Sequence, residues 1–416
     1  MPERKEGVVP RLRFPEFRDA GPWEVKSIKE LSDKVTQGGT PNTSINEYWD
    51  GDIPWITPAE MGNDAEYHYI ANTNRTISML GLKNSSAELL PKNSVIISSR
   101  APIGYVAINK LEMATNQGCK GIIPKVDVYY DFLYFCLLNA QRHLNDLGAG
   151  AGFKELSTSV LKKFQIPVPK LPEQQKIADC LSSLDRVIEL EAQKLEALKA
   201  HKKGLMQLLF PRKGETTPRL RFPTFRDAEE WEVKRLGEIC SAFSGGTPIS
   251  SRKEYYGGSI PFIRSAEINQ DTTELFLTEE GLKNSSAKLV VKGDILVALY
   301  GANSGDGALS KIDGAINQAI LCLRSKFNHL FILDYWRLRK NEIVMRFIQG
   351  GQGNLSAEIV KSIAFAFPSL PEQQKIADFF SSLDEIIDLQ AQKLEAFKTH
   401  KKGLMQQLFP QEVGIE

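Results

Sequence analysis

The sequence has no long hydrophobic run and few cysteines. Across its 416 residues no apolar stretch approaches the roughly 20 residues of a membrane-spanning helix. The N-terminus, MPERKEGVVPRLRF, lacks the apolar core of a secretory signal. The five cysteines form no CxxC pair, which indicates buried free thiols in a reducing compartment. We therefore expect a cytoplasmic protein without disulfides or a zinc site.

The sequence also lacks an excess of charge of one sign. Lysine and arginine total 52, aspartate and glutamate total 51, and the net charge is +1. A protein that binds nucleic acid unaided usually has a stronger basic bias. Charge alone therefore does not predict DNA binding, and any neutralisation of phosphates would be local or shared with a partner.

Motifs for catalysis are missing as well. The chain contains no GxxxxGK[ST] phosphate loop, no HExxH, no GxSxG and no Asn/Asp-Pro-Pro-aromatic run of the kind that adenine methyltransferases use. Its five histidines stand at unrelated spacings. We predict that this chain holds no catalytic residue, no metal and no cofactor of its own.

What the sequence does contain is a long repeat. Residues 171–211, from LPEQQKIAD to LFP, return at 370–410 with 32 of 41 positions identical. Pro172 followed by Glu173 suits the start of a helix, because proline has no amide to orphan and the acid favours the helix dipole. At about 1.5 Å per residue, each helix would be roughly 55–60 Å long.

Apolar residues in both copies recur at alternating steps of four and three, which is the spacing of a coiled-coil seam. Glu191, Lys202, Gln390 and Lys401 interrupt this seam with polar side chains. The predicted seam consists of Ile177, Leu181, Leu184, Ile188, Leu195, Leu198, Leu205, Ile376, Phe380, Leu383, Ile387, Leu394, Phe397 and Leu404.

The duplication extends through the rest of the chain. PRLRFPEFRDAGPWEVK at 10–26 returns at 218–234 as PRLRFPTFRDAEEWEVK. GGTP, IP[WF]I and GLKNSSA each occur once in either half, and Asn116-Gln117 matches Asn317-Gln318. Between these anchors the halves diverge, with short β-prone runs in both and one helix expected at about 131–146 or 330–348. We predict an α+β tandem repeat with globular regions at 1–170 and 212–369, and long helices at 171–211 and within 370–416.

Chain connections favour an antiparallel helix pair. Only about six residues lead from Pro211 into the second globular region, so that region lies at the C-terminal end of the first helix. A parallel pair would force a region about 40 Å across to bridge the whole helix length. The sequence therefore predicts two strand-rich regions at opposite ends of an antiparallel pair, related by a pseudo-two-fold axis, with the C-terminus returning beside the N-terminus.

The shared signatures allow two interpretations. The GGTP turns could cradle a phosphate with backbone amides or serve as tight connections between strands. GLKNSSA could offer side chains to a phosphate backbone or cap a helix. The Asn-Gln pairs could read adenine edges, but side chains that read different sequences should differ between the copies, which favours a structural role.

Direct DNA contacts should come mainly from the polar segments between the anchors. Those segments are 42–46, 72–75 and 98–100 in the first half, and 250–253, 264 and 300–304 in the second. Together with residues of the shared signatures, the candidates are Thr40, Asn42, Thr43, Asn74, Arg75, Lys83, Ser98, Arg100, Thr247, Ser250, Arg252, Lys253, Arg264, Lys283, Tyr300 and Asn303.

Two divergent regions that each end in a near-identical helix opened by Pro-Glu-Gln resemble the specificity (S) subunit of type I restriction–modification enzymes. The resemblance covers essentially the whole chain. It implies that the globular regions are target recognition domains, joined by two long antiparallel coiled-coil helices. Each domain would read one half of a bipartite, asymmetric site in double-stranded DNA, while the helices set the spacer.

The resemblance also implies partners. Two modification (methyltransferase) subunits would dock on the helices, and restriction/translocase subunits would join them. S-adenosylmethionine, ATP and Mg²⁺ would bind to those subunits, and this chain would be non-catalytic. One alternative is a coiled-coil scaffold that binds only proteins through its two globular regions. The other is a stand-alone nuclease or methyltransferase, which the missing motifs disfavour.

Overall fold

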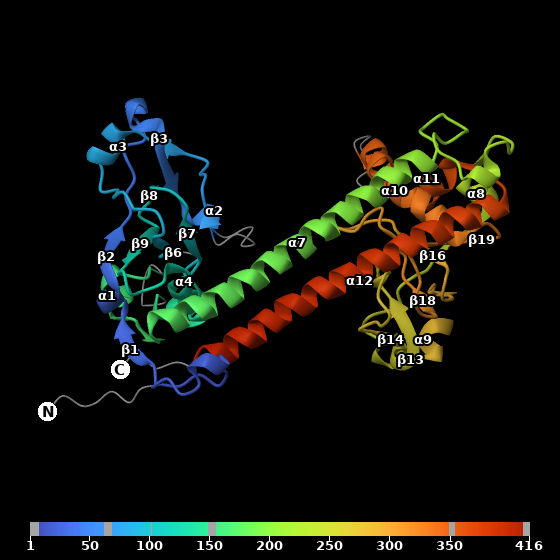
Figure 1. The fold of residues 1–416 in the computed structure, drawn as a ribbon. Coiled ribbons are helices and arrows are strands. Elements are labelled where there is room, and N and C mark those ends of the chain that lie inside the picture. The colour runs from blue at the N-terminus through green and yellow to red at the C-terminus, as the bar shows by residue number, and fades with distance from the viewer. Residues whose placement is uncertain (1–7, 62–68, 101, 149–154, 349–353, 411–416) are drawn as a thin grey trace. The chain divides into compact units, whose positions relative to one another are not determined.

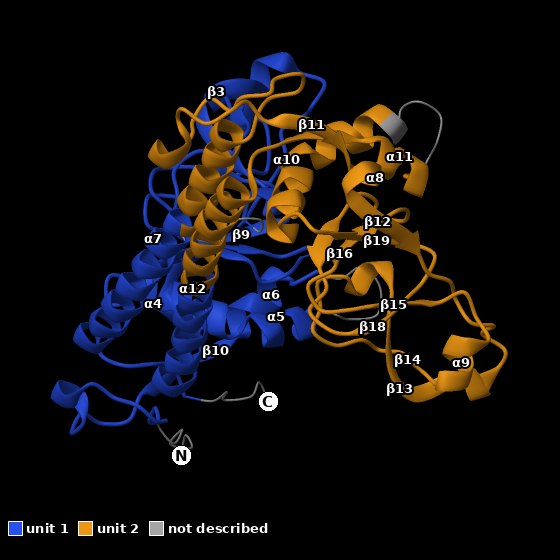
Figure 2. Cartoon of the chain, turned by 90° about the vertical axis from the view of Figure 1, so that its right-hand side faces the viewer, with its two compact units in different colours: residues 1–194, 391–416 blue, residues 195–390 orange. Residues whose placement is uncertain are grey.

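The computed structural model describes residues 8–61, 69–100, 102–148, 155–348 and 354–410. Its chain forms two compact units (Figure 2): residues 1–194 with 391–416, and residues 195–390. The boundaries between the units fall inside the two long helices, α7 (Leu171–Leu209) and α12 (Leu370–Leu408). Each unit therefore contains one globular region, part of α7 and part of α12.

The first unit is built on two sheets and a two-stranded ribbon (Figure 1). The larger sheet has the order β2-β9-β6-β7-β4, and the smaller one β5-β3-β8. The ribbon pairs β1 with β10 and joins the globular region to α7. The strands are β1 (Glu24–Ser27), β2 (Ser32–Gln37), β3 (Trp49–Ile56), β4 (Tyr69–Ile70), β5 (Thr76–Ile77), β6 (Val95–Ser98), β7 (Val106–Asn109), β8 (Ala114–Thr115), β9 (Cys119–Pro124) and β10 (Gln165–Val168).

Helices bury one face of this larger sheet. Buried aromatic and aliphatic residues of α4, such as Phe132 and Leu137, pack in one core with Ile97 of β6, Trp23 and the first turns of α7. The helices of the first globular region are α1 (Ile28–Leu31), α2 (Pro58–Met61), α3 (Met79–Lys83), α4 (Tyr130–Asn139), α5 (Gln141–Leu147) and α6 (Thr158–Lys163).

The second unit repeats this plan with one strand fewer in the larger sheet. That sheet has the order β12-β19-β16-β17, the smaller one β14-β13-β18-β15, and β11 pairs with β20. Its strands are β11 (Glu232–Arg235), β12 (Cys240–Ser244), β13 (Tyr256–Ile263), β14 (Phe276–Leu277), β15 (Lys288–Val290), β16 (Ile295–Ala298), β17 (Gly307–Leu309), β18 (Gly314–Ile316), β19 (Ile320–Ser325) and β20 (Ala364–Phe367), and its helices are α8 (Leu236–Ile239), α9 (Glu279–Lys283), α10 (His329–Ile348) and α11 (Ala357–Ser362).

The prediction of a single helix at 131–146 is wrong, because the segment forms two helices. The backbone leaves the helical region at Ala140 (ψ 6°), so the segment forms α4 and α5 instead. The break lets both pieces bury apolar side chains: Phe132–Leu137 are buried in α4, and Leu144 is buried in α5. In the second unit the corresponding segment is one helix, α10, as expected.

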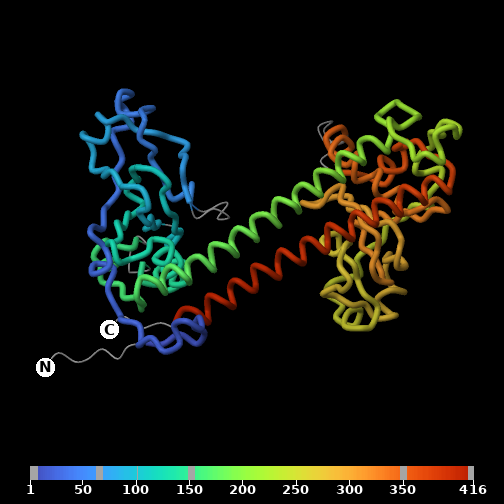
Figure 3. Tube along the Cα trace, viewed as in Figure 1, coloured from blue at the N-terminus to red at the C-terminus, as the bar shows by residue number. Residues whose placement is uncertain are grey.

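The long helices pair antiparallel within each unit. In the first unit, Lys393 Nζ lies 2.6 Å from Glu191 Oε1, and Lys401 forms an ion pair with Asp185. In the second unit, Lys202 Nζ lies 2.6 Å from Asp384. As the residue number rises along α7, the partner's number falls along α12. The α7 and α12 traces are each unbroken in Figure 3.

Every predicted seam residue is buried or half-buried. Three of the four polar interruptions form the cross-helix ion pairs just described, which satisfies their charge at the seam. The fourth, Gln390, is buried. Met206 and Met405 are also buried beside the seam, although the heptad pattern did not include them.

The N-terminal segment is held to both helices of the first unit. Leu12 N donates to Gln407 O (3.0 Å). The Arg13 guanidinium donates two hydrogen bonds, both 2.7 Å long, to the two oxygens of the Glu173 carboxylate. This side-chain hydrogen bond to Glu173 raises the pKa of Arg13. The N-terminal segment thus lies against the last turns of α12, as the predicted return of the C-terminus requires. Arg221 and Glu372 form the same pair of hydrogen bonds in the second unit.

Candidate nucleic-acid interface

The shared signatures meet at one point in each unit. In the first unit, a Cβ on Gly38 would lie 1.8 Å from Asn116 O, and one on Gly39 would lie 2.3 Å from Ser86 Oγ. The GGTP turn is therefore wedged between the Asn-Gln pair and the end of GLKNSSA. Only glycine permits so close an approach of backbones. This favours the tight-connection interpretation of the turn.

The second unit reproduces this wedge. A Cβ on Gly245 would lie 1.7 Å from Ile316 O, and one on Gly246 would lie 2.5 Å from Ser286 Cβ. In both units the asparagine of the Asn-Gln pair closes a local turn: Asn116 Oδ1 accepts from Gly118 N (2.9 Å) and Asn317 Oδ1 from Ala319 N (3.1 Å). These contacts give the retained signatures a structural role.

The threonine of each GGTP turn remains exposed and contacts the glutamine of the same junction. The Thr40 hydroxyl donates to Gln117 Oε1, and the Thr247 hydroxyl donates to Gln318 Oε1 (2.7 Å). Each hydroxyl and glutamine amide therefore form a fixed polar group at the surface of the junction.

Arg75 stacks on an aromatic side chain. Its Cζ lies 3.6 Å from the centre of the Trp49 ring, and Trp49 packs edge-to-face on Trp55 at 5.1 Å. A guanidinium over an indole face is held by cation–π attraction while its donors stay at the edge. Arg75 itself is exposed, so the two buried tryptophans present its N–H groups at the surface.

The structure brings the other polar candidates of the 38–45 and 74–83 segments to the same smaller sheet. Asn42 O accepts from Trp49 Nε1 (3.2 Å), and Asn42 Oδ1 accepts from Ser44 N (3.0 Å). Asn74 N donates to Glu60 Oε1 (2.6 Å). Thr43 is exposed, and Lys83 is exposed in the last turn of α3. All of these residues lie on segments next to the strands of the β5-β3-β8 sheet, as Arg75 does.

Ser98 must be withdrawn as a DNA contact. Its side chain is fully buried, and its hydroxyl donates to Pro102 O (2.7 Å) and accepts from Tyr105 N (2.8 Å). The polar run at 98–100 predicted exposure, but Ser98 ends a strand whose residues are all buried. Its hydroxyl instead closes the turn that follows β6.

Arg100 is exposed but belongs to the larger sheet rather than to the surface around Arg75. Its Nε lies 3.3 Å from Glu155 Oε2, and Lys120 Nζ lies 3.6 Å from Glu155 Oε1. The Lys120 side chain is only 1% exposed, and burial lowers its pKa. Sequence inspection missed this buried lysine, because it stands in an apolar strand run with no neighbouring charge.

In the second unit, four candidates are exposed at the smaller sheet: Ser250, Arg252, Lys253 and Lys283. Arg264 differs, because Glu267 and Glu274 both bind its guanidinium, at 2.9 Å and 2.5 Å. The Glu267 carboxylate, followed by Glu274, raises the pKa of Arg264. Its charge is already neutralised inside the unit, which makes it a weaker candidate for a phosphate.

Tyr300 and Asn303 lie on the loop after β16. Tyr300 is half-buried and packs on the second core, and Asn303 O accepts from Asp306 N (2.9 Å). Like Arg100, they belong to the larger sheet. Within each unit, the candidates therefore divide between the smaller and the larger sheet.

The described residues show neither a metal-binding cluster nor a helix suited to a membrane. In the described parts of the chain, no group of three or more His, Cys, Asp or Glu side chains could hold a metal ion. No described helix is long and apolar enough to cross a membrane.

Comparison with known proteins finds one family. Residues 21–200 and 228–399 match the family model described as the type I restriction modification DNA specificity domain. The chain is 32% identical over 417 residues to the type I restriction enzyme MjaIX specificity subunit of Methanocaldococcus jannaschii, covering 95% of this chain and 94% of that protein. It is 31% identical to the EcoR124I/EcoR124II specificity subunit of Escherichia coli over 40% of this chain and 41% of that one.

Solved structures share the fold. The S subunit of a type I restriction-modification system from M. genitalium superposes with a TM-score of 0.59 at 17% identity, covering 98% of this chain and all of that one. A chain from a study of the assembly of the type I R-M system superposes with a TM-score of 0.60 at 16% identity, covering 94% and 98%.

Proposed function

Because the chain belongs to the type I restriction–modification DNA specificity family, we propose that it gives a restriction–modification complex its sequence preference. Each unit reads one half of a bipartite, asymmetric site in double-stranded DNA. The α7–α12 pair sets the number of unread base pairs between the halves.

One observation carries this proposal: the two units share a backbone framework, but they place different side chains at equivalent positions of it. Thr73 and Thr273 occupy equivalent positions, and each hydroxyl donates to the carbonyl two residues on at 2.7 Å. That carbonyl belongs to Arg75 in the first unit and to Leu275 in the second. Arginine suits guanine, whereas an apolar side chain suits a thymine methyl group. The same framework thus supports two different readouts.

The helices are proposed to hold two copies of one partner. Val187 and Leu190 are exposed on α7, and Ile386 and Leu389 are exposed at the matching positions of α12. Paired apolar residues on a surface are typical of protein contacts. Because the repeat presents the same pair of apolar side chains on each helix, two identical modification subunits would bind, one to each pair.

The catalytic steps are proposed to belong to the partner subunits. The modification subunits would bind S-adenosylmethionine and methylate adenine, and the restriction subunits would bind ATP and Mg²⁺. We propose that this chain is a non-catalytic, cytoplasmic subunit.

The test is to map modified adenines by single-molecule sequencing in cells that co-express this chain and its modification subunit. The proposal predicts one bipartite motif that disappears when this chain is omitted. A complex that assembles but modifies or binds DNA without sequence preference would favour the protein-only scaffold.

A further inference from the structure

The larger sheets of the two units end differently. In the first unit, β4 covers the last strand: it pairs parallel with β7, with Tyr69 opposite Ile108 and Ile70 opposite Asn109. Lys110 N also donates to Ile70 O (2.8 Å). In the second unit, β17 corresponds to β7, since Asn109 and Ser310 each stand seven residues before the asparagine of the Asn-Gln pair. Among the described residues, no strand pairs with the outer side of β17.

A difference in segment length accounts for the missing strand. Glu60 and Glu267 are equivalent, because each carboxylate accepts a hydrogen bond from the backbone amide three residues before it. The donor is Thr57 N in the first unit and Arg264 N in the second. In the first unit, 12 residues (61–72) lie between Glu60 and Thr73. In the second unit, only 5 residues (268–272) lie between the equivalent Glu267 and Thr273. The second unit is thus seven residues shorter where the first supplies β4.

The open strand has hydrogen-bonding groups that point away from its sheet. Ser310 N donates to Asp294 O (2.8 Å), and Ser310 O accepts from Gly293 N (2.8 Å), so both Ser310 groups face β16. Backbone groups alternate along a strand, which directs those of Leu309 and Lys311 to the opposite side. Ile108 is fully buried under β4, whereas its counterpart Leu309 is only half-buried.

A pocket of about 460 Å³ lies along this edge. Leu309, Leu330 and Leu333 give it an apolar wall, and the cations Lys292, Lys311 and Arg337 line it without any carboxylate. Arg337 has an anionic neighbour, Asp334 Oδ1 at 3.7 Å. Lys292 and Lys311 have no ion-pair partner among the described residues. The pocket therefore combines apolar side chains with uncompensated positive charge.

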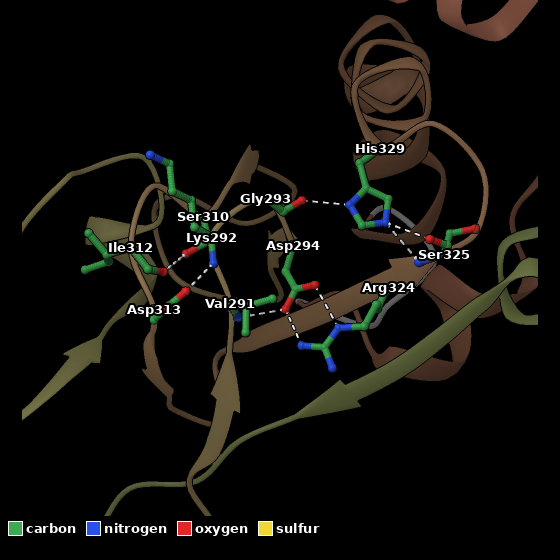
Figure 4. A network of polar contacts seen from close by, with 10 residues as sticks. All are labelled: Val291, Lys292, Gly293, Asp294, Ser310, Ile312, Asp313, Arg324, Ser325 and His329. Atoms are coloured by element: carbon green, nitrogen blue, oxygen red, sulfur yellow. Dashed lines mark hydrogen bonds and ion pairs between the residues drawn. The ribbon is translucent and has the colours of Figure 1, made fainter. Parts of the chain in front are cut away.

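The wall of the pocket is held in place by a polar network (Figure 4). His329 Nδ1 lies 2.7 Å from Gly293 O, Ser310 Oγ donates to Ile312 O (2.7 Å), and Lys292 N donates to Asp313 Oδ1 (2.7 Å). The Lys292 side chain extends away from this network in Figure 4. The edge is thus fixed before anything binds to it.

We propose that the outer edge of β17 binds an extended segment of another subunit, which adds to the sheet as a fifth strand. The segment lies parallel to β17, in the place that β4 takes in the first unit. It carries a large apolar side chain against Leu309 and Leu330, and acidic side chains beside Lys292 and Lys311. In the first unit, Tyr69 donates its hydroxyl to Asp131. The aligned residue in α10 is Leu330, which favours a side chain without a hydroxyl.

Strand addition of this kind gains affinity from backbone hydrogen bonds and specificity from alternate side chains. An uncovered edge is also a risk of self-association, which most proteins avoid by covering it. The inference rests on the proposed function in one respect, because the occupant is taken to be a modification or restriction subunit of the same complex.

Hydrogen exchange of the full chain, alone and in the complete complex, tests the inference. We expect the amides of Leu309 and Lys311 to exchange at least tenfold more slowly in the complex, before DNA is added. Peptides that span 106–110, where β4 already covers the edge, serve as the internal control and should not change. Copurification and adenine modification in the same samples report separately on the proposed function.

Two variants sharpen the test. Replacing residues 268–272 with residues 61–72, with Phe in place of Tyr69, should close the edge within the chain and abolish the slowing by partners. Lys311→Pro removes an edge-facing amide and should weaken the slowing at least tenfold, whereas Lys311→Ala removes only charge and should weaken it a few-fold. Melting curves check that the variants fold.

Three results would overturn the inference. A complete complex that leaves exchange at 307–311 unchanged would show that no subunit binds there. Slowing that appears only when DNA is added would assign the edge to DNA. Slowing of the isolated chain that grows with its concentration would assign it to a second copy.

Discussion

Glycine has opposite roles at two kinds of position in this chain. Gly39 is wedged against Ser86 and Ala87, and a Cβ there would lie 2.3–2.5 Å from their atoms. Gly204 and Gly403 stand inside the long helices, and a Cβ at either would meet nothing within 4 Å. The first kind is required by packing, while the second only weakens a helix.

Alanine substitutions should separate the two roles. Gly204→Ala is expected to raise the free energy of unfolding by about 0.5–1 kcal/mol, because alanine loses less backbone entropy in a helix. Gly39→Ala should lower it by about 1–3 kcal/mol through overpacking. Denaturant titration measures both, and a Gly39→Ala protein as stable as the parent would refute the wedge.

Asp334 should make the second unit more stable in mild acid. Its side chain is 4% exposed. Burial raises its pKa to about 6, although Lys202 and Arg337 act in the opposite direction. An unfolded aspartate titrates near 3.9, so the folded unit binds this proton more tightly. Its stabilising effect is therefore present at low pH and lost as the pH rises through 6.

From pH 8 to pH 5, Asp334 should add about 1–2 kcal/mol to the stability of the second unit. Asp334→Asn should remove that part of the pH dependence. Thermal melts of both proteins across this range give the difference, and parallel curves would show that Asp334 does not titrate there.

At the scale of elements, ion pairs across the helix seam specify the register of α7 and α12. Lys401 and Asp185 are both mostly buried, with side chains 16% and 15% exposed, whereas Asp384 opposite Lys202 is 44% exposed. A buried pair that loses one partner costs more than an exposed one. The two equivalent pairs are therefore natural controls for each other.

Reversing charge at these pairs should reveal the difference. Lys401→Glu is expected to destabilise the first unit by roughly 1–3 kcal/mol, and adding Asp185→Lys should recover at least half of the loss. Asp384→Lys in the second unit should cost less than about 1 kcal/mol. If Asp185→Lys gave no recovery in a double-mutant cycle, the pair would not set the register.

The sequence predicted the elements that repeat and missed those that do not. The heptads of 171–211 specify an antiparallel pair because the seam and the short linker leave few alternatives. Strands such as β6 and β16 followed from β-branched runs. The buried Ser98 and the break at Ala140 depend on tertiary packing, which no local pattern encodes. The open edge of β17 goes with the shorter segment at 268–272, whose role becomes visible only once the strands are paired. The sequence named Arg75 as a candidate because of its position between the anchors. It did not predict the stacking of Arg75 on Trp49, or the packing of Trp49 against Trp55, because the two tryptophans are six residues apart on β3.

At the scale of the whole molecule, the tandem repeat predicts two equivalent docking positions. Leu190→Asp should remove one modification subunit from the complex, Leu389→Asp the other, and the double variant both, because a charge cannot be buried in an apolar contact. Val126→Asp, at a side chain 96% exposed, is the control. Native mass spectrometry counts the subunits, and a double variant that still binds two would place docking elsewhere.

The central claim is that each unit reads its own half of the site. The β1–β10 and β11–β20 ribbons mark equivalent boundaries, so residues 236–363 can be replaced with residues 28–164. The resulting chain carries the globular region of the first unit twice. Single-molecule sequencing of modified adenines then gives the new motif. Because the helices pair antiparallel, we predict a symmetric site: the half-site of the first unit, an unread spacer and the reverse complement of that half-site. An active variant that still modifies the original asymmetric motif would contradict the account.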